Sequence, residues 1–190
     1  MIHHRFSLHL SLALLVLAGL FLPGRLAADM VSFPKERTVN GQTFTLRGEA
    51  VLRVGMVFRV YRAAFYMGRD IATERVLEDV PMRLEVNYYR SISRDQLIMV
   101  ADEILNKIAT REELESIRER LETLNGWYQS VERGDLYTLT YLPDIGLELA
   151  FNGEVLGVVE GHDFARVYLA IWLGDHPYSR GLNRKLLGGD

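Results

Sequence analysis

Few side chains in this sequence of 190 residues are of the types that perform nucleophilic, acid–base or metal chemistry. Cysteine is absent, which excludes thiol catalysis, cysteine-bound zinc and disulfide bonds. Beyond residue 28 only two histidines occur, His162 and His176. His162 begins an apolar, helix-like segment beside Asp163, so we expect it to serve the helix terminus rather than act as a base. His176 is expected in a structural loop. The sequence therefore predicts no metal site and no cofactor.

Two pairs of adjacent carboxylates also invite an acid–base interpretation. They are Asp102-Glu103 and Glu112-Glu113, both in segments with helical periodicity. Neighbouring residues of a helix point in different directions, so the members of each pair cannot converge on one substrate atom. We expect both pairs to lie on solvated helix faces, and we predict no catalytic residue from them.

Composition and charge limit the remaining function classes. Hydrophobic residues make up 48% of the chain and charged residues 25%, values typical of one globular domain with a substantial core. The 22 basic and 25 acidic residues give a net charge of −3, without a long run of lysine or arginine. Such a chain lacks the positive surface that neutralises a phosphate backbone, so we expect no nucleic-acid partner.

The first 28 residues have the pattern of a secretory signal peptide. The basic residue Arg5 precedes a mostly apolar run over 6–22, and a Pro-Gly pair then breaks the run ahead of small residues that end at Ala28. The residue three places before the cleavage site is larger than usual, so an uncleaved membrane anchor is the alternative. We expect a signal peptide over 1–28, one domain over 29–190, a periplasmic or secreted location, and no membrane span after leader removal.

Alternating apolar and polar residues predict a long antiparallel sheet. Asn-Gly pairs at 40–41 and 152–153 are the preferred two-residue turns of β-hairpins. The segment 82–88 alternates with a period of two, which indicates a strand with one buried face. The predicted strands cover residues 37–39, 42–46, 50–54, 57–61, 82–88, 136–141, 146–151 and 155–159.

The spacing of apolar residues becomes helical at Ser93. Ser93 with Gln96, and Thr110 with Glu113, are typical of capping boxes at the starts of two amphipathic helices. Two further helices are predicted, over 164–173 and 182–187. The order of strands, helices, strands and helix predicts an α+β fold in which a layer of helices packs on one face of a long antiparallel sheet.

Several short motifs in a fixed order carry a resemblance to a known family. The first is the run RVGMVFRVYRAAFYM from Arg53 to Met67. Further pieces follow at 134–135, 141–146, 152–157, 171–174 and 182–188. Together they resemble the exported bacterial branch of the chalcone isomerase-like family over roughly residues 38–188. The resemblance implies a chalcone isomerase-like fold with a ligand cleft between the sheet and its helices. Members of this family include plant enzymes that close a chalcone into a flavanone, and other members bind fatty acids.

The resemblance also assigns residues, and it implies that part of the enzymes' site is missing. The family's cleft arginine corresponds best to Arg53, with Arg47 as the alternative. Tyr61 occupies the position of the enzymes' catalytic threonine, as in the fatty-acid binders. The enzymes' remaining polar positions fall near three aliphatic residues, Leu97, Ile104 and Ile171. Losing one donor that stabilises an oxyanion typically costs about two to three orders of magnitude in rate, so these replacements favour binding over turnover.

The residues assigned by this resemblance suit a hydrophobic carboxylate. A guanidinium can bond a carboxylate through two N–H groups, and a phenol can donate a further hydrogen bond. We therefore expect Arg53 and Tyr61 at the polar end of an apolar cleft that holds a hydrophobic small molecule such as a fatty acid. Two alternatives stay open. One is an isomerase or lyase that acts on an unknown enone through Arg53; the other is an envelope protein-interaction module whose ligand is another chain.

Overall fold

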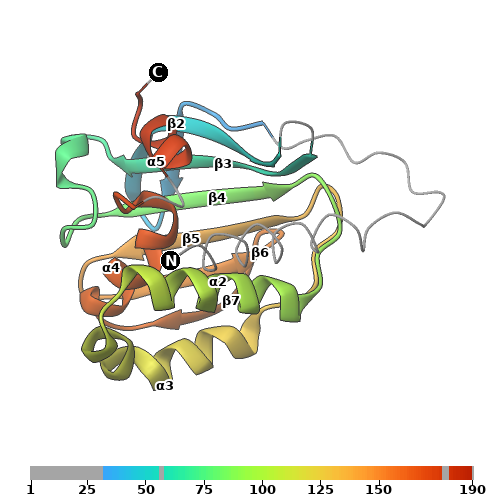
Figure 1. The fold of residues 1–190 in the computed structure, drawn as a ribbon. Coiled ribbons are helices and arrows are strands. Elements are labelled where there is room, and N and C mark those ends of the chain that lie inside the picture. Colours follow the sequence, from blue (N-terminus) through green and yellow to red (C-terminus); the bar gives the residue numbers. More distant parts are fainter. Residues whose placement is uncertain (1–31, 56–57, 177–179, 190) are drawn as a thin grey trace.

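The computed structural model describes residues 32–55, 58–176 and 180–189, and the predicted signal peptide lies outside these residues. The described chain forms a seven-stranded sheet in which each strand pairs antiparallel with the next one in sequence (Figure 1). The strands are β1 Glu36–Val39, β2 Gln42–Val54, β3 Phe58–Gly68, β4 Met82–Tyr88, β5 Leu136–Leu142, β6 Gly146–Phe151 and β7 Glu154–Val159. The helices are the 3-10 turn η1 Thr73–Arg75, α2 Arg94–Ile108, α3 Arg111–Trp127, α4 His162–Leu173 and α5 Arg180–Leu186. The predicted α+β fold is confirmed.

Two strands are longer than the sequence predicts. The segments predicted separately at 42–46 and 50–54 form one strand, β2, and β3 continues to Gly68 instead of ending at residue 61. Leu46 pairs with Tyr66 and Gly48 pairs with Phe65, so the intervening residue of β2 forms a bulge. Because β3 supplies hydrogen-bonding partners on both sides of the bulge, β2 continues through a glycine. This pairing depends on the tertiary structure, so the alternation of residues within β2 does not predict it.

The hairpin turns and helix starts follow from local sequence. Asn40 and Gly41 have φ angles of 49° and 75°, the left-handed backbone that a tight two-residue hairpin turn requires. The side chain of Ser93 accepts a hydrogen bond from the backbone N–H of Gln96, and Thr110 holds the start of α3 in the same way. Both capping boxes are complete, so these predictions are confirmed.

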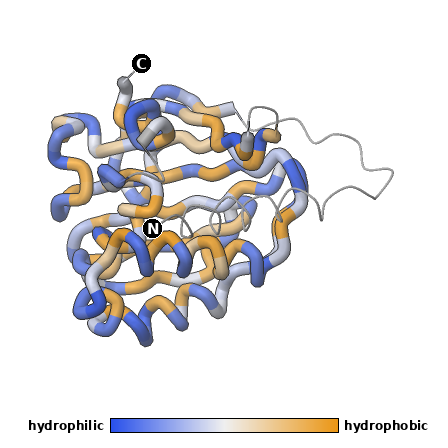
Figure 2. The backbone as a smooth tube through the Cα atoms, viewed as in Figure 1, coloured by the Kyte–Doolittle hydropathy of each residue, from blue (hydrophilic) through white to orange (hydrophobic). Residues whose placement is uncertain are grey.

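The helices cover one face of the sheet, called here the inner face. Inward residues of successive strands, such as Phe65, Leu84 and Leu139, form the main core with α2, α3, α4 and α5. α4 is apolar around most of its circumference because it packs against α2, α3 and β6 at once. Figure 2 shows hydrophobic positions along the strands, and mixed hydrophobic and hydrophilic positions along α2 and α3.

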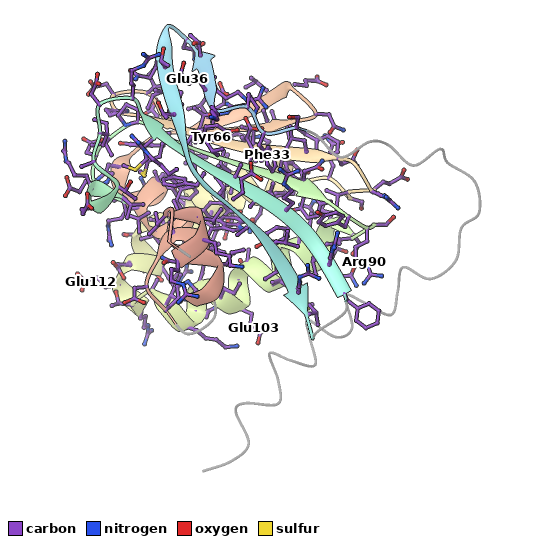
Figure 3. The ribbon with its side chains drawn as sticks, turned by 90° about the horizontal axis from the view of Figure 1, so that it is seen from above. Phe33, Glu36, Tyr66, Arg90, Glu103 and Glu112 are labelled. Carbon is purple, nitrogen blue, oxygen red and sulfur yellow. The ribbon has the colours of Figure 1, made fainter. Side chains whose placement is uncertain are left out.

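The other face of the sheet, the outer face, carries a smaller core. Phe33, which precedes β1, packs there with Phe44, Ala64 and Tyr66 (Figure 3). The residues before and within β1 therefore cover part of a face that has no helix among the described residues. None of the described helices is long and apolar enough to cross a membrane.

Candidate functional site

Aromatic side chains line the inner face where β3, β4, β5 and β6 lie side by side. Tyr61 of β3 and Tyr88 of β4 are register partners, and their ring centroids lie 5.9 Å apart. The ring of Tyr137 in β5 follows at 6.3 Å from that of Tyr88, and Phe151 of β6 follows at 4.7 Å from Tyr137. Strand alternation places all four side chains on the inner face, so they form one row under the helices.

The helices add three more aromatic side chains to this row. Tyr128 directly follows α3, and its hydroxyl is hydrogen-bonded to that of Tyr168 in α4 at 2.8 Å. Trp172, one helical turn beyond Tyr168, lies near the hydroxyl of Tyr61, and its ring centroid is 5.9 Å from that of Tyr168. Phenol groups from five positions thus meet between the sheet and α4. We call Tyr61, Tyr88, Tyr128, Tyr137 and Tyr168 the tyrosine cluster.

Burial keeps the phenols of this cluster neutral. It raises the pKa of Tyr61, Tyr88, Tyr128 and Tyr168 above the ordinary tyrosine value, because a phenolate would lose its hydration there. The nearby N–H donor of Trp172 opposes this effect on the pKa of Tyr61 in part. These hydroxyls are therefore hydrogen-bond donors and acceptors at neutral pH, and they are poor general bases.

Two hydroxyls of the cluster can donate to a ligand. Among the described residues the Tyr61 hydroxyl donates to no acceptor, and the neighbouring indole of Trp172 can only donate, so the O–H proton of Tyr61 stays available. In the described part of the chain the Tyr88 hydroxyl has no hydrogen-bond partner, and the residue is only 6% exposed. Tyr61 and Tyr88 are therefore the two cluster members best placed to bind a polar group.

The surroundings of these hydroxyls are aliphatic. Leu97 and Ile104 of α2 pack against the main core, and Ile171 of α4 lies within it. These are the positions at which the family resemblance places polar residues in the enzymes. The interior near the tyrosine cluster accordingly offers phenol hydroxyls at one end and hydrocarbon along α2, a combination that suits an elongated apolar molecule with one polar end.

The structure separates the two predicted ligand-binding residues. Tyr61 lies in the cluster, but Arg53 is exposed near the end of β2, opposite Arg59. Leu52, which precedes Arg53, is the register partner of Tyr61, and the register shifts by one residue between Leu52 and Arg53. The guanidinium therefore lies at the end of the hairpin that carries Tyr61, outside the buried interior. Contact of either side chain with a ligand stays a prediction.

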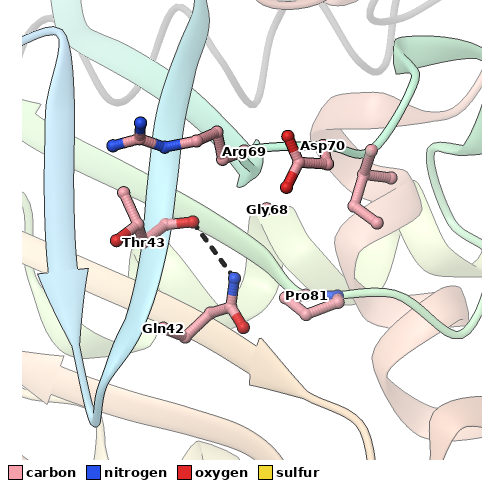
Figure 4. A pocket seen from close by; sticks show the side chains of 7 residues that line it. Gln42, Thr43, Gly68, Arg69, Asp70 and Pro81 are labelled. Carbon is pink, nitrogen blue, oxygen red and sulfur yellow. Dashed lines mark hydrogen bonds between the residues drawn. The ribbon is translucent and has the colours of Figure 1, made fainter.

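The alternative arginine, Arg47, has a structural role. Its Nη2 donates to the backbone oxygens of Gly68 at 3.0 Å, Arg69 at 3.3 Å and Ile71 at 2.7 Å, and so fixes the loop after β3. A hollow of about 330 Å³ opens beside this loop, and Figure 4 shows the bond of 3.1 Å from Gln42 Nε2 to the oxygen of Thr43 at its edge. The hollow lies at the far end of β2 from Arg53 and does not reach the tyrosine cluster.

A second hollow, of about 570 Å³, lies between α2 and α3. Its lining mixes charged residues such as Arg94 and Glu122 with Ile98 and Met99. Asp102 also lines it, and burial raises the pKa of this carboxyl, while a hydrogen bond with the Asn125 side chain opposes the rise. This hollow is open to solvent and carries no member of the tyrosine cluster.

The remaining titratable candidates have structural partners. Nε2 of His162 lies 3.1 Å from the backbone oxygen of Leu77, and Nε2 of His176 lies 3.0 Å from the backbone oxygen of Ala170. Glu103 forms an ion pair with Lys107 within α2, so it does not act together with its sequence neighbour Asp102. Among the described residues no group of three histidine, aspartate or glutamate side chains is arranged to hold a metal ion.

From the sequence alone we assign no ligand role to Tyr88, Tyr128 or Tyr168. A partial signal exists: Tyr88 lies on the inward side of an alternating strand, and Tyr168 lies four residues before Trp172 on one helical face. Tyr88 lies against Tyr61 because of the register between β3 and β4, which the alternation of residues within one strand does not predict.

We expect the free energy of unfolding to fall when the pH rises above about 10, the ordinary tyrosine pKa. Unfolded tyrosines then ionise, whereas the cluster stays protonated because its pKa values are raised. On the outer face, burial also raises the pKa of Tyr66 to about 12. Each buried tyrosine can contribute a loss of up to about 1.4 kcal/mol per pH unit until its folded-state pKa is reached. Urea unfolding between pH values of about 8 and 11, read with phenolate absorbance, measures the loss; a flat profile contradicts it.

The fold and the sequence both have known relatives. An Arabidopsis thaliana fatty-acid binding protein has a similar structure, with a TM-score of 0.62 and 16% sequence identity, over 83% of this chain and 92% of that chain. At this identity the likeness shows a shared fold. No curated protein matches the chain in sequence. The model of the chalcone isomerase-like family matches residues 26–188, most of the sequence. The chain therefore belongs to the chalcone isomerase-like family.

Proposed function

We propose that this protein is a non-catalytic binder of a hydrophobic carboxylate such as a fatty acid. The observation that carries the proposal is the pair of phenol donors, Tyr61 and Tyr88, set at the end of an aliphatic interior between the sheet and the helices. The similar plant structure is that of a fatty-acid binding protein, which is consistent with this use of the fold.

The head group of the acid would bind at the tyrosine cluster. A buried carboxylate is costly unless donors replace its water, and charge-assisted hydrogen bonds from Tyr61 and Tyr88 would supply two such donors. Arg53, at the end of the same hairpin, would add positive potential from outside the interior. The hydrocarbon tail would lie along the aliphatic side of α2. Because the two hollows described above do not reach this region, the tail requires Leu97 and Ile104 to repack.

The chemistry of the site argues against an isomerase. Ring closure of a chalcone needs a phenolate held near the enone carbon and preorganised donors aimed at the developing enolate. Leu97, Ile104 and Ile171 cannot donate, and the neutral phenols of the cluster are weak bases. Turnover of an enone that is abolished in Arg53→Ala would instead support the lyase alternative.

We also propose that the protein is exported, as in the bacterial branch that it resembles. The support is the sequence of residues 1–28, in which the basic residue Arg5 precedes an apolar run and small residues stand at the end. A fatty-acid binder outside the cytoplasm would meet its ligand in the periplasm or the medium. Cell fractionation of the tagged full chain, with N-terminal sequencing of the product, tests both the location and cleavage near Ala28.

Calorimetric titration with palmitate tests the binding site. In Tyr88→Phe and Tyr61→Phe we expect affinity to fall about tenfold to a hundredfold, the usual value of a hydrogen bond to a charged group. Tyr66→Phe is the matched control, since this tyrosine lies on the outer face and should bind palmitate like the unaltered chain. Equal affinity in all three variants would place the ligand elsewhere, and no heat of binding in the unaltered chain would reject the proposal.

A further inference from the structure

The end of the β2–β3 hairpin exposes an aromatic side chain among arginines. Phe58, the first residue of β3, is 49% exposed, and the guanidinium of Arg90 lies 5.7 Å from its ring centroid. The guanidinium of Arg59 lies 5.7 Å from the ring of Tyr89. Arg53 is exposed opposite Arg59. We call Arg53, Phe58, Arg59, Tyr89 and Arg90 the arginine–aromatic rim, and Figure 3 shows Arg90 at this end of the hairpin.

The positive charge of the rim is not balanced locally. Within residues 32–55, 58–176 and 180–189, Arg53, Arg59 and Arg90 have no carboxylate partner within ion-pair distance. One guanidinium nitrogen of Arg90, Nη1, is buried without a hydrogen-bond partner in the same part of the chain. Three other arginines in or beside the sheet pair with carboxylates: Arg37 with Glu85, Arg62 with Glu49, and Arg69 with Glu36. Three cations without an ion-pair partner among the described residues thus gather at one end of a chain with a net charge of −3.

We propose that the arginine–aromatic rim docks the protein on an anionic lipid surface. The headgroup region of a bilayer suits these residues. Aromatic rings and the apolar stems of arginine contact the hydrocarbon there, and the guanidinium groups contact the charged headgroups. Anionic lipids supply the charge that the three guanidinium groups lack. Nucleic acid is a poorer fit, because three arginines on a net acidic chain make a small footprint for a phosphate backbone.

The rim adjoins the candidate ligand site. Tyr61 follows Arg59 by two residues, and the backbone N–H of Tyr89 donates to the oxygen of Val60 at 2.9 Å. Docking through the rim would therefore bring the end of the interior nearest Tyr61 and Tyr88 to the bilayer. Transfer of a fatty acid between the bilayer and this interior rests on the proposed function, whereas docking rests only on the residues of the rim.

Flotation with vesicles tests the docking. The full chain is mixed with vesicles of phosphatidylcholine alone or of phosphatidylcholine with phosphatidylglycerol. Each arginine near an anionic surface contributes about fivefold in affinity, so the triple variant R53Q/R59Q/R90Q should bind the anionic vesicles about a hundredfold more weakly. The control R75Q/R111Q/R118Q removes three exposed arginines elsewhere and should stay within about twofold of the unaltered chain. Both variants keep the same N-terminal segment, so its own affinity for lipid cancels.

A local readout separates the rim from other parts of the chain. In Phe58→Trp the indole should show emission at shorter wavelength, and quenching by brominated lipid, when anionic vesicles are added. The proposal is wrong if the two triple variants lose binding equally, if the unaltered chain does not prefer anionic vesicles, or if the emission of Phe58→Trp is unchanged. Failure to bind palmitate in the calorimetric test leaves these outcomes unaffected, so the two proposals fail separately.

Discussion

Replacing Glu85 with alanine should lower the free energy of unfolding by about 3–5 kcal/mol. The carboxylate of Glu85, on the outer face of β4, is fully buried. Its Oε2 accepts a hydrogen bond of 3.0 Å from Arg37, and its Oε1 accepts one of 2.9 Å from Arg83. Arg83 also donates to the hydroxyl of Thr140 at 2.7 Å. Removing the carboxylate leaves a guanidinium that is only 14% exposed without its counter-ion, which is the costly event.

The ion pair between Glu49 and Arg62 provides the control for this prediction. It lies on the same face of the sheet, but its side chains are 32% and 28% exposed. Solvent screens such a pair, so Glu49→Ala should cost no more than about 1 kcal/mol. Urea unfolding of both variants measures the difference. An equal loss of unfolding free energy in the two variants would show that the ion pairs of Glu85 stabilise the protein no more than a surface ion pair does.

Replacing Gly48 with alanine should cost about 2–4 kcal/mol, because α5 packs directly on this glycine. A Cβ at this position would lie 2.0 Å from the backbone oxygen of Lys185 and 2.8 Å from that of Leu186. Backbone atoms cannot rotate away, so the end of α5 must move and Leu186, now fully buried, must lose contacts with the main core.

Gly126 offers the matching substitution with the opposite sign. It lies within α3, and a Cβ there would meet nothing within 4 Å. Gly126→Ala should therefore stabilise the protein by about 0.5–1 kcal/mol through helix propensity. If thermal or urea unfolding shows that Gly48→Ala is tolerated like Gly126→Ala, α5 does not pack on β2 as described.

The parts of the fold that the sequence predicts are those determined by neighbouring residues. Asn40-Gly41 needs only a left-handed backbone, and Ser93 with Gln96 closes a capping box within one turn. The continuity of β2 depends on pairing with β3 across a bulge, so the strand continues past the point where the alternating sequence pattern is interrupted. Glu85 shows the same limit: its place on the polar side of β4 suggests solvent, yet Arg37 and Arg83 enclose it.

The candidate site was predicted in part for a similar reason. The family resemblance led to Tyr61, which lies in the interior, and to Arg53, which is exposed. Arg53 follows Leu52, the register partner of Tyr61, so strand alternation turns its side chain to the opposite face. Tyr88 faces Tyr61 through register, and Tyr168 meets Tyr128 through helix packing. Neither contact is encoded in the spacing of residues along one element, so sequence reasoning reached one residue of the tyrosine cluster.

Native mass spectrometry of the gently purified full chain tests most directly whether this protein holds a fatty acid. We expect part of the protein to carry one additional mass equal to that of a long-chain fatty acid. This mass should be depleted in the double variant Tyr61→Phe/Tyr88→Phe but kept in Tyr66→Phe. A chain that carries no such mass and takes up none when incubated with palmitate would show that it is not a fatty-acid binder.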